Sequence, residues 1–198
     1  MLKKYEFHFG ESMEKEKQEY EKISRLDNVK VLISEKELQE KISQLGEQIS
    51  RDYEGRIPVL ISVLKGSFIF IADLCRKIRI PIVFDFMAVS SYGNSMASSG
   101  VVRITKDLDY NIQDRDVLIV EDIIDSGRTL HYLVKNIEAR NPKSLEICAL
   151  LDKDVKGKIK NNIKYKGFDI PDEFVIGYGL DYAENYRNLS YIGYIENG

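Results

Sequence analysis

The sequence predicts an α/β fold, with a mainly parallel central sheet flanked by helices and a small additional lobe. Continuous apolar runs of strand length, PVLISVL (58–64), VLIV (117–120) and LEICALLDK (145–153), are typical of parallel strands covered on both faces. Helical patterns separate these runs, and strands that alternate with helices favour a parallel sheet. The 198 residues, 43% of them hydrophobic, allow one sizeable core but not two full domains.

The N-terminal residues 1–28 are mostly charged, with opposite charges four residues apart, as in Lys15 and Glu19. We expect a solvated helical arm there, and a partner-binding arm is the alternative. A short strand, VKVLIS (29–34), follows. Ser34 and Glu37 have the spacing of a capping box, which predicts that a helix starts here. Its apolar face would contain Leu38, Ile42, Leu45 and Ile49.

The central elements follow the same alternation of strand and helix. After the strand at 58–64, Lys65-Gly66-Ser67 turns into the helix FIFIADLCRKI. PIVFDFMAVS (81–90) is the next strand, SSYGNSMASSG (90–100) is a loop that we expect to be mobile, and VVRITKDLD (101–109) is a candidate strand. DVLIVEDII (116–124) is predicted to form another strand. We expect the helix after it to start at Thr129 and to turn one apolar face inward, with Leu130, Leu133, Val134 and Ile137.

The C-terminal tail contains FVIGYGLDY and YIGYIE, which suggest short strands in a separate lobe. We therefore expect one domain over residues 29–198. Its core would span about residues 55–150, and a hood would be formed by the N- and C-terminal segments.

Composition and charge exclude several classes of protein. A net charge of −3 and a pI of about 5.6 argue against a general nucleic-acid binder. No apolar run approaches the ~20 residues of a membrane span, and the N-terminus has no apolar signal-peptide core. Cys75 and Cys148 lie in apolar stretches, as buried free thiols do in a reduced, cytoplasmic compartment. The only histidines, His8 and His131, argue against a histidine zinc site or a Ser-His-Asp triad.

The segment DVLIVEDIIDSGRTL (116–130) carries the chemistry. Glu121 and Asp122 follow four apolar residues at the carboxyl end of a strand, where ligands bind in such folds. Because the pleat relaxes at the end of a strand, both carboxylates can turn toward one ligand. Two adjacent acids suit a vicinal diol, and they also suit a hydrated Mg²⁺.

The residues that follow suit a phosphate. Asp125-Ser126-Gly127-Arg128-Thr129 enters a helix, whose first N–H groups, with the Ser and Thr hydroxyls, form an anion cradle. Gly127 would let the backbone approach the ligand closely. A diol site beside a monophosphate site outlines a ribose 5-phosphate. An acidic strand end followed by an ordinary helix cap is the structural alternative, and it does not readily explain two adjacent acids.

VLIVEDIIDSGRTL resembles the phosphoribosyl pyrophosphate (PRPP) motif of type I phosphoribosyltransferases, and an acid at Asp125 resembles the 6-oxopurine branch of that family. The resemblance spans roughly residues 29–195. It includes VLISEKEL, LKGSFIFIADL, SSYG, LLDK and PDEFVIGYGLDYAENYRNL, in the expected order.

The resemblance implies purine salvage. The 5-phosphoribosyl group of PRPP would pass to N9 of hypoxanthine or guanine, giving IMP or GMP and pyrophosphate. It implies that Glu121 and Asp122 hold the ribose hydroxyls and a Mg²⁺ cofactor, with Asp181 as a second metal ligand. Asp125, Ser126, Gly127, Arg128 and Thr129 would hold the 5-phosphate. A homodimer or homotetramer is implied by resemblance alone, and no nucleic-acid or membrane partner is expected.

The family also assigns roles at the base. The resemblance implies that Asp125 is catalytic, facing N7 of the purine and handling its proton, and that Lys153 reaches the 6-oxo group. Phe174 would stack on the purine, Val175 would offer its backbone carbonyl, and Asp181 would lie at the same site. Without the resemblance, Lys153 would be an ordinary surface lysine and Phe174 a core residue.

The remaining roles concern pyrophosphate and closure of the site. Lys65 and Gly66 resemble the pyrophosphate loop, with a cis Leu64–Lys65 peptide bond in at least one state. Arg187 resembles the arginine that binds pyrophosphate, where a planar donor fork suits phosphate oxygens. Ser91 and Tyr92 match a mobile loop that closes over the site and excludes water.

Two alternatives stay open. The same chemistry could serve another base, such as xanthine, because backbone groups read the purine 2-position. A regulatory protein of this fold that binds nucleotide or RNA is the alternative from another class. Asp125, Lys153 and Arg187, and the absence of an evident basic face, argue against it.

Overall fold

The computed structural model describes residues 29–91, 102–159 and 162–195. The arm expected at 1–28 and most of the loop expected at 90–100 lie outside these ranges. No helix in the described ranges is both long enough and apolar enough to cross a membrane.

The main sheet has six strands in the order β4-β3-β2-β5-β6-β7. All neighbours pair in parallel except β4, which is antiparallel to β3 at one edge. The strands are β2 (Val59–Leu64), β3 (Val83–Ser91), β4 (Val102–Lys106), β5 (Asp116–Ile124), β6 (Ser144–Lys153) and β7 (Tyr165–Ile170). The predicted α/β class with a mainly parallel sheet is therefore confirmed.

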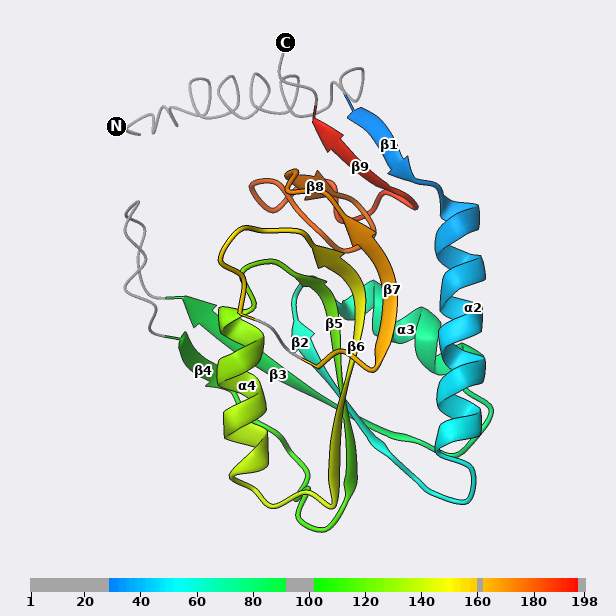
Figure 1. Cartoon of the computed structure of the whole chain (residues 1–198), viewed down its shortest axis with the longest axis vertical. Coiled ribbons are helices and arrows are strands. Elements are labelled where there is room, and N and C mark those ends of the chain that lie inside the picture. The colour runs from blue at the N-terminus through cyan, green and yellow to red at the C-terminus, as the bar shows by residue number, and fades with distance from the viewer. Residues whose placement is uncertain (1–28, 92–101, 160–161, 196–198) are drawn as a thin grey trace, which may run out of the picture.

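Helices cover both faces of this sheet (Figure 1). Helices α2 (Glu35–Asp52) and α3 (Phe68–Lys77) pack on one face, against alternate residues such as Leu118 and Val120 of β5. Helix α4 (Arg128–Glu138) covers the other face, against the intervening residues Val117 and Ile119. Burial on both faces explains why the central strands read as continuous apolar runs.

Helix α2 starts as the sequence predicts. The N–H of Ser34 donates to the carboxylate of Glu37 at 2.8 Å, and the N–H of Glu37 donates to the Ser34 hydroxyl at 3.3 Å. This reciprocal pair is a capping box. The predicted inward face is correct, because four of the helix side chains are buried: Leu38, Ile42, Leu45 and Ile49.

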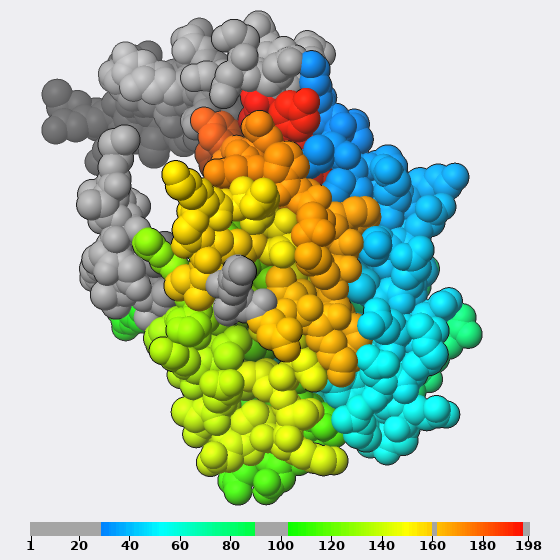
Figure 2. Space-filling view, in the orientation of Figure 1, coloured from blue at the N-terminus to red at the C-terminus, as the bar shows by residue number. Residues whose placement is uncertain are grey.

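A second sheet joins the two ends of the described chain. Its order is β1-β9-β8, all antiparallel, with β1 (Val29–Ile33), β8 (Val175–Ile176) and β9 (Ile192–Ile195). It lies beyond the carboxyl ends of the parallel strands (Figure 1), and Figure 2 shows the blue N-terminal and red C-terminal segments together at that end. Ile33, Val175 and Ile192 pack in the same core cluster as α2 and α3, so this lobe is fixed to the main sheet.

Two elements differ from the expectation. Strand β7 was not predicted, because Gly167 and exposed polar residues interrupt its pattern. Gly167 has a steric role, since a Cβ there would overlap the backbone oxygen of Leu150 on β6. Strand β5 continues past the acidic pair to Ile124, so Glu121 and Asp122 lie within the strand's last residues.

Candidate functional site

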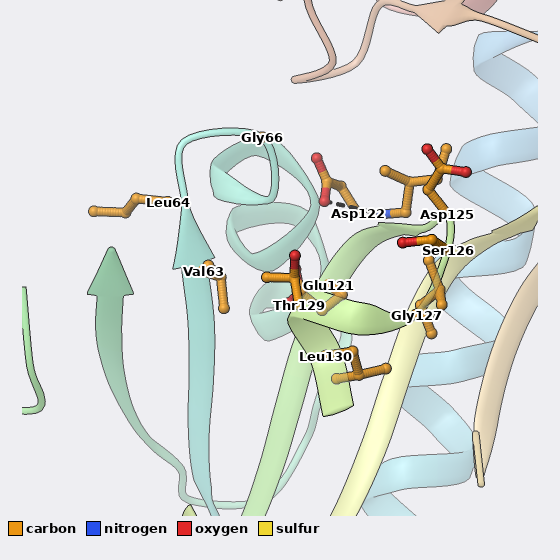
Figure 3. Close-up of a pocket in the computed structure, with 12 residues that line it drawn as sticks. Val63, Leu64, Gly66, Glu121, Asp122, Asp125, Ser126, Gly127, Thr129 and Leu130 are labelled. Atoms are coloured by element: carbon orange, nitrogen blue, oxygen red, sulfur yellow. Dashed lines mark hydrogen bonds between the residues drawn. The ribbon is translucent and has the colours of Figure 1, made fainter. Parts of the chain in front are cut away.

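A pocket of about 210 Å³ opens at the carboxyl ends of β2 and β5. Its walls combine the end of β2, the turn at Gly66, residues 121–127, and Thr129 and Leu130 of α4 (Figure 3). The acidic pair and the predicted phosphate loop therefore line one pocket, as expected from their position at this edge of the sheet.

The acidic pair is electrostatically costly in the absence of a cation. Glu121 is 7% exposed, and burial together with the neighbouring Asp122 raises its pKa well above the usual value. Burial raises the pKa of Asp122 to about 6. Backbone hydrogen bonds and the positive charge of Arg187 oppose this rise, and one of these hydrogen bonds is donated by the N–H of Ile123 to Oδ1 of Asp122 at 2.9 Å. A bound cation or hydroxyl donors would relieve the pair.

The segment after β5 forms an exposed helix N-terminus. Asp125, Ser126, Arg128 and Thr129 are exposed, and Gly127 adopts a left-handed conformation (φ 76°) directly before α4. A glycine fits there because a side chain would make this conformation unfavourable. The first N–H groups of an α-helix have no partner within the helix, and the start of α4 lines this pocket, an arrangement that suits an anion.

The turn after β2 touches the acidic pair directly. The Leu64–Lys65 peptide bond is cis, as the resemblance implies. A Cβ at Gly66 would overlap the carboxylate of Asp122, and a Cβ at Gly179 would overlap the backbone oxygen of Gly66. Only glycines at both positions allow the turn, the acidic strand end and the C-terminal segment to meet.

Lys65 and Arg187 both contact one carboxylate, that of Glu184. The Nζ atom of Lys65 is 2.9 Å from Oε2 of Glu184, and the guanidinium of Arg187 is 3.3 Å from the same oxygen. Arg187 also contacts Oδ1 of Asp181 at 2.8 Å and donates to the backbone oxygen of Gly179 at 2.8 Å. Hydrogen bonds from Lys65 and Arg187 hold the pKa of Glu184 below its usual value.

The predicted purine residues gather at the ends of β6 and β8. The Nζ atom of Lys153 lies 3.8 Å from Oδ1 of Asp125 and 3.1 Å from Oδ1 of Asp172, and its side chain is 12% exposed. Phe174 is 57% exposed and packs edge-to-face on Tyr182, with ring centroids 5.8 Å apart. Phe174 is therefore a surface ring, and the reading of this residue as core is wrong. Val175 is buried as the first residue of β8.

Among residues 29–91, 102–159 and 162–195, no three His, Cys, Asp or Glu side chains are grouped closely enough to hold a metal ion by themselves. Asp181, the predicted second ligand, pairs with Arg187 instead. The site still suits Mg²⁺, which keeps several waters and is held by one or two carboxylates with substrate phosphates. Glu121 and Asp122 supply such a pair, and because burial raises the pKa of both carboxyls, a nearby cation would favour their ionised forms.

The structure leaves one predicted feature outside its range and adds two residues. Ser91 ends β3, and Tyr92 lies outside the described residues. The sequence reasoning missed Asp172 and Glu184, which contact Lys153 and Lys65. In the sequence, these two acids stand out only by being close to Phe174 and Arg187. That proximity does not reveal a contact with lysines from other segments of the chain.

Comparisons with known proteins agree with this geometry. The family model described as phosphoribosyl transferase domain matches residues 32–183. The hypoxanthine-guanine phosphoribosyltransferase of Mycobacterium bovis is 54% identical over 172 residues, which are 84% of this chain and 85% of that protein. The hypoxanthine phosphoribosyltransferase of Buchnera aphidicola is 54% identical over 167 residues, covering 83% of this chain and 94% of its own.

Solved structures give the same result. The crystal structure of a hypoxanthine-guanine phosphoribosyltransferase from Bacillus anthracis matches with a TM-score of 0.80 and 50% identity, covering 84% of this chain and 98% of that one. A hypoxanthine phosphoribosyltransferase from Staphylococcus aureus matches with a TM-score of 0.82 and 45% identity over 86% of this chain and 93% of its own. The pocket, the order of its motifs and these similarities show that the chain belongs to the phosphoribosyltransferase family.

Proposed function

We propose that this protein is a purine-salvage enzyme. It transfers the 5-phosphoribosyl group of PRPP to N9 of hypoxanthine or guanine and releases pyrophosphate with IMP or GMP. The observation that carries the proposal is that the acidic pair, the N-terminus of α4 and the Lys153–Asp125 pair lie around the ends of two adjacent strands. The names of relatives that are 54% identical support the choice of base.

The ribose and its phosphate would bind along the end of β5. Glu121 and Asp122 accept hydrogen bonds from the ribose hydroxyls, and the backbone N–H groups and hydroxyls of residues 125–129 hold the 5-phosphate. Mg²⁺, when bound, neutralises charge on the pyrophosphate group. Glu121 and Asp122 would hold it together with PRPP oxygens, and Asp181 would hold a second ion after leaving Arg187.

The purine would bind between Lys153 and Phe174. Lys153 donates to the 6-oxo group, while Asp125 faces N7 and takes up the proton that the ring must lose. Phe174 has an exposed ring available for stacking, and the Val175 carbonyl can accept from the base edge. The bond between N9 and C1 of the ribose then forms as the bond from C1 to the pyrophosphate oxygen breaks.

Pyrophosphate would leave from a site made by Lys65, the backbone of Gly66, and Arg187. Two cations from separate segments suit a group with dense negative charge. The segment that starts at Ser91 and Tyr92 would cover the site and exclude water, because water could otherwise attack the electron-poor C1 centre. We further propose that residues 29–198 form one domain, that residues 1–28 form an arm, and that the protein is a homodimer or homotetramer.

A base panel tests the function. Purified protein is incubated with PRPP, Mg²⁺ and each of hypoxanthine, guanine, xanthine, adenine and uracil, and nucleotide products are separated by chromatography. We expect IMP or GMP to dominate. Preferred use of xanthine would keep the chemistry and change the base. No conversion of any base by folded protein would contradict the proposal and favour a regulatory nucleotide-binding protein.

A further inference from the structure

Glu184 contacts both of the cations that the proposed function assigns to pyrophosphate. A single oxygen, Oε2, lies 2.9 Å from Lys65 Nζ and 3.3 Å from the guanidinium of Arg187. Lys65 comes from the turn after β2, whereas Glu184 and Arg187 come from the segment between β8 and β9. The carboxylate therefore bridges two separate segments at the pyrophosphate site.

The backbone around Glu184 is built to present its side chain. The N–H of Glu184 donates to Oδ2 of Asp181 at 2.8 Å, and Tyr182 and Asn185 form an isolated antiparallel bridge. Ala183, Glu184 and Tyr186 have φ angles of 49°, 65° and 70°. Residues with side chains rarely adopt this region, and such residues cluster at functional sites. The tight loop formed by residues 181–187 thus fixes the direction of Glu184 toward Lys65.

A carboxylate and a phosphate oxygen compete for the same donors. The ammonium of Lys65 and the guanidinium of Arg187 bind either anion through the same N–H groups, and the two anions cannot share one position. We propose that Glu184 is a resident anion, which holds Lys65 and Arg187 in the ligand-free protein and is displaced when pyrophosphate or the pyrophosphate group of PRPP binds. This inference rests on the proposed function, because that function assigns the two cations to pyrophosphate.

Competition between Glu184 and pyrophosphate for the same cations has a consequence for turnover. The carboxylate keeps both cations in place before PRPP arrives, and it returns to them as pyrophosphate leaves. It therefore lowers the affinity of the site for pyrophosphate and speeds release of this product. A purely structural ion pair would predict the reverse, a loss of stability without a gain in affinity. Because Glu184 and Lys65 are each 67% exposed, we expect little contribution to stability.

The test compares Glu184→Gln with the matched control Glu47→Gln, which removes the same charge from the exposed face of α2. Binding of magnesium pyrophosphate to each full-length protein is measured by titration calorimetry, with Tm measured in parallel. We expect Glu184→Gln to bind roughly two- to fivefold more tightly than wild type, the scale set by exposed ion pairs, and Glu47→Gln to bind as wild type does. The gain should shrink in high salt, because screening weakens exposed charges.

Kinetics supply a second readout. Product inhibition by pyrophosphate should strengthen by the same factor in Glu184→Gln, while the KM for the purine stays unchanged. Unchanged or weaker pyrophosphate binding by Glu184→Gln, with wild type active and binding, would overturn this inference and leave the proposed function standing. Wild-type protein that neither binds magnesium pyrophosphate nor transfers the phosphoribosyl group would remove both.

Discussion

The Nζ atom of Lys153 lies 3.8 Å from Oδ1 of Asp125, and the two residues come from the ends of the neighbouring parallel strands β6 and β5. Asp172 contacts the same ammonium at 3.1 Å. In a 6-oxopurine, O6 and N7 lie next to each other on one edge of the ring. A donor and an acceptor this close together can therefore serve both atoms of one base.

Asp125→Asn should separate proton handling from binding. Asn keeps the shape and one acceptor but cannot take up a proton, so we expect kcat to fall by about 10²–10⁴ while the KM for PRPP changes little. Steady-state kinetics with each substrate varied in turn would measure both constants. A variant with nearly wild-type turnover, or with a defect in PRPP binding alone, would leave Asp125 as part of the scaffold of the loop.

Lys153→Gln should relax the choice of base. The ammonium of Lys153 offers only donors, whereas Gln presents a donor or an acceptor and can accept from a 6-amino group. We expect kcat/KM for hypoxanthine to fall and the ratio of hypoxanthine to adenine to fall with it. Lys153→Gln also removes the ion pairs of Lys153 with Asp125 and Asp172. Asp172→Asn removes only one of these ion pairs and keeps the lysine, so it is the control. An unchanged ratio in Lys153→Gln would remove this lysine from the base site.

Gly66→Ala should damage PRPP binding through Asp122. A Cβ at Gly66 would overlap the Asp122 carboxylate, so that side chain must move or the turn must shift. We expect the KM for PRPP to rise by at least tenfold, with a smaller change for the purine. Gly55→Ala is the control, because Gly55 has a positive φ of 72° but nothing within reach of a Cβ. It should lower stability by about 1 kcal/mol and leave KM unchanged. Equal KM values for PRPP in the two variants would contradict the contact.

Activity should require a divalent cation. PRPP is densely charged, and burial already raises the pKa values of Glu121 and Asp122, so more negative charge beside this pair is costly without a cation. After exhaustive EDTA treatment we expect turnover to be lost, and Mg²⁺ or Mn²⁺ to restore it. Full turnover in EDTA would show that the chain's own cations are sufficient.

Much of the fold follows from local patterns, because these patterns reflect burial. The continuous apolar run of β5 and the capping box at Ser34 each identify their element without tertiary information. Strand β7 could not be predicted in this way, because Gly167 interrupts its pattern of apolar residues. The role of Gly167, a close approach to the Leu150 backbone, depends on a strand from elsewhere in the sequence.

The candidate site shows the same division. Glu121, Asp122 and the loop that follows are contiguous, so one segment is enough to predict a diol site and a phosphate site. Contacts between distant segments, such as Lys65 with Glu184, leave no local signal. The acid that contacts a given lysine can come from any part of the sequence. Pairs such as Lys65 and Glu184 are therefore visible only in the folded chain.

Asp122→Asn should stabilise the metal-free protein, even though it weakens PRPP binding. Burial raises the pKa of Asp122 from 3.8 to about 6, so ionised Asp122 disfavours the folded state. The penalty is fully present at pH values well above 6, the pKa of Asp122 in the folded protein, because the carboxyl is then ionised in both the folded and the unfolded state. It disappears as the pH falls toward the unfolded value. Asn also relieves Glu121, whose pKa the charge of Asp122 helps to raise.

In EDTA at pH 8, we expect the free energy of unfolding of Asp122→Asn to be higher than that of wild type by roughly 1–3 kcal/mol. The difference should narrow as the pH falls through 6 and vanish near pH 4. Scanning calorimetry at several pH values measures it, with Glu47→Gln as a control that removes an exposed charge. Because Mg²⁺ and PRPP bind only the folded protein, adding both should raise the Tm of wild type more than that of the variant. A variant less stable than wild type at every pH would mean that Asp122 supports the fold through contacts that outweigh the burial of its charge.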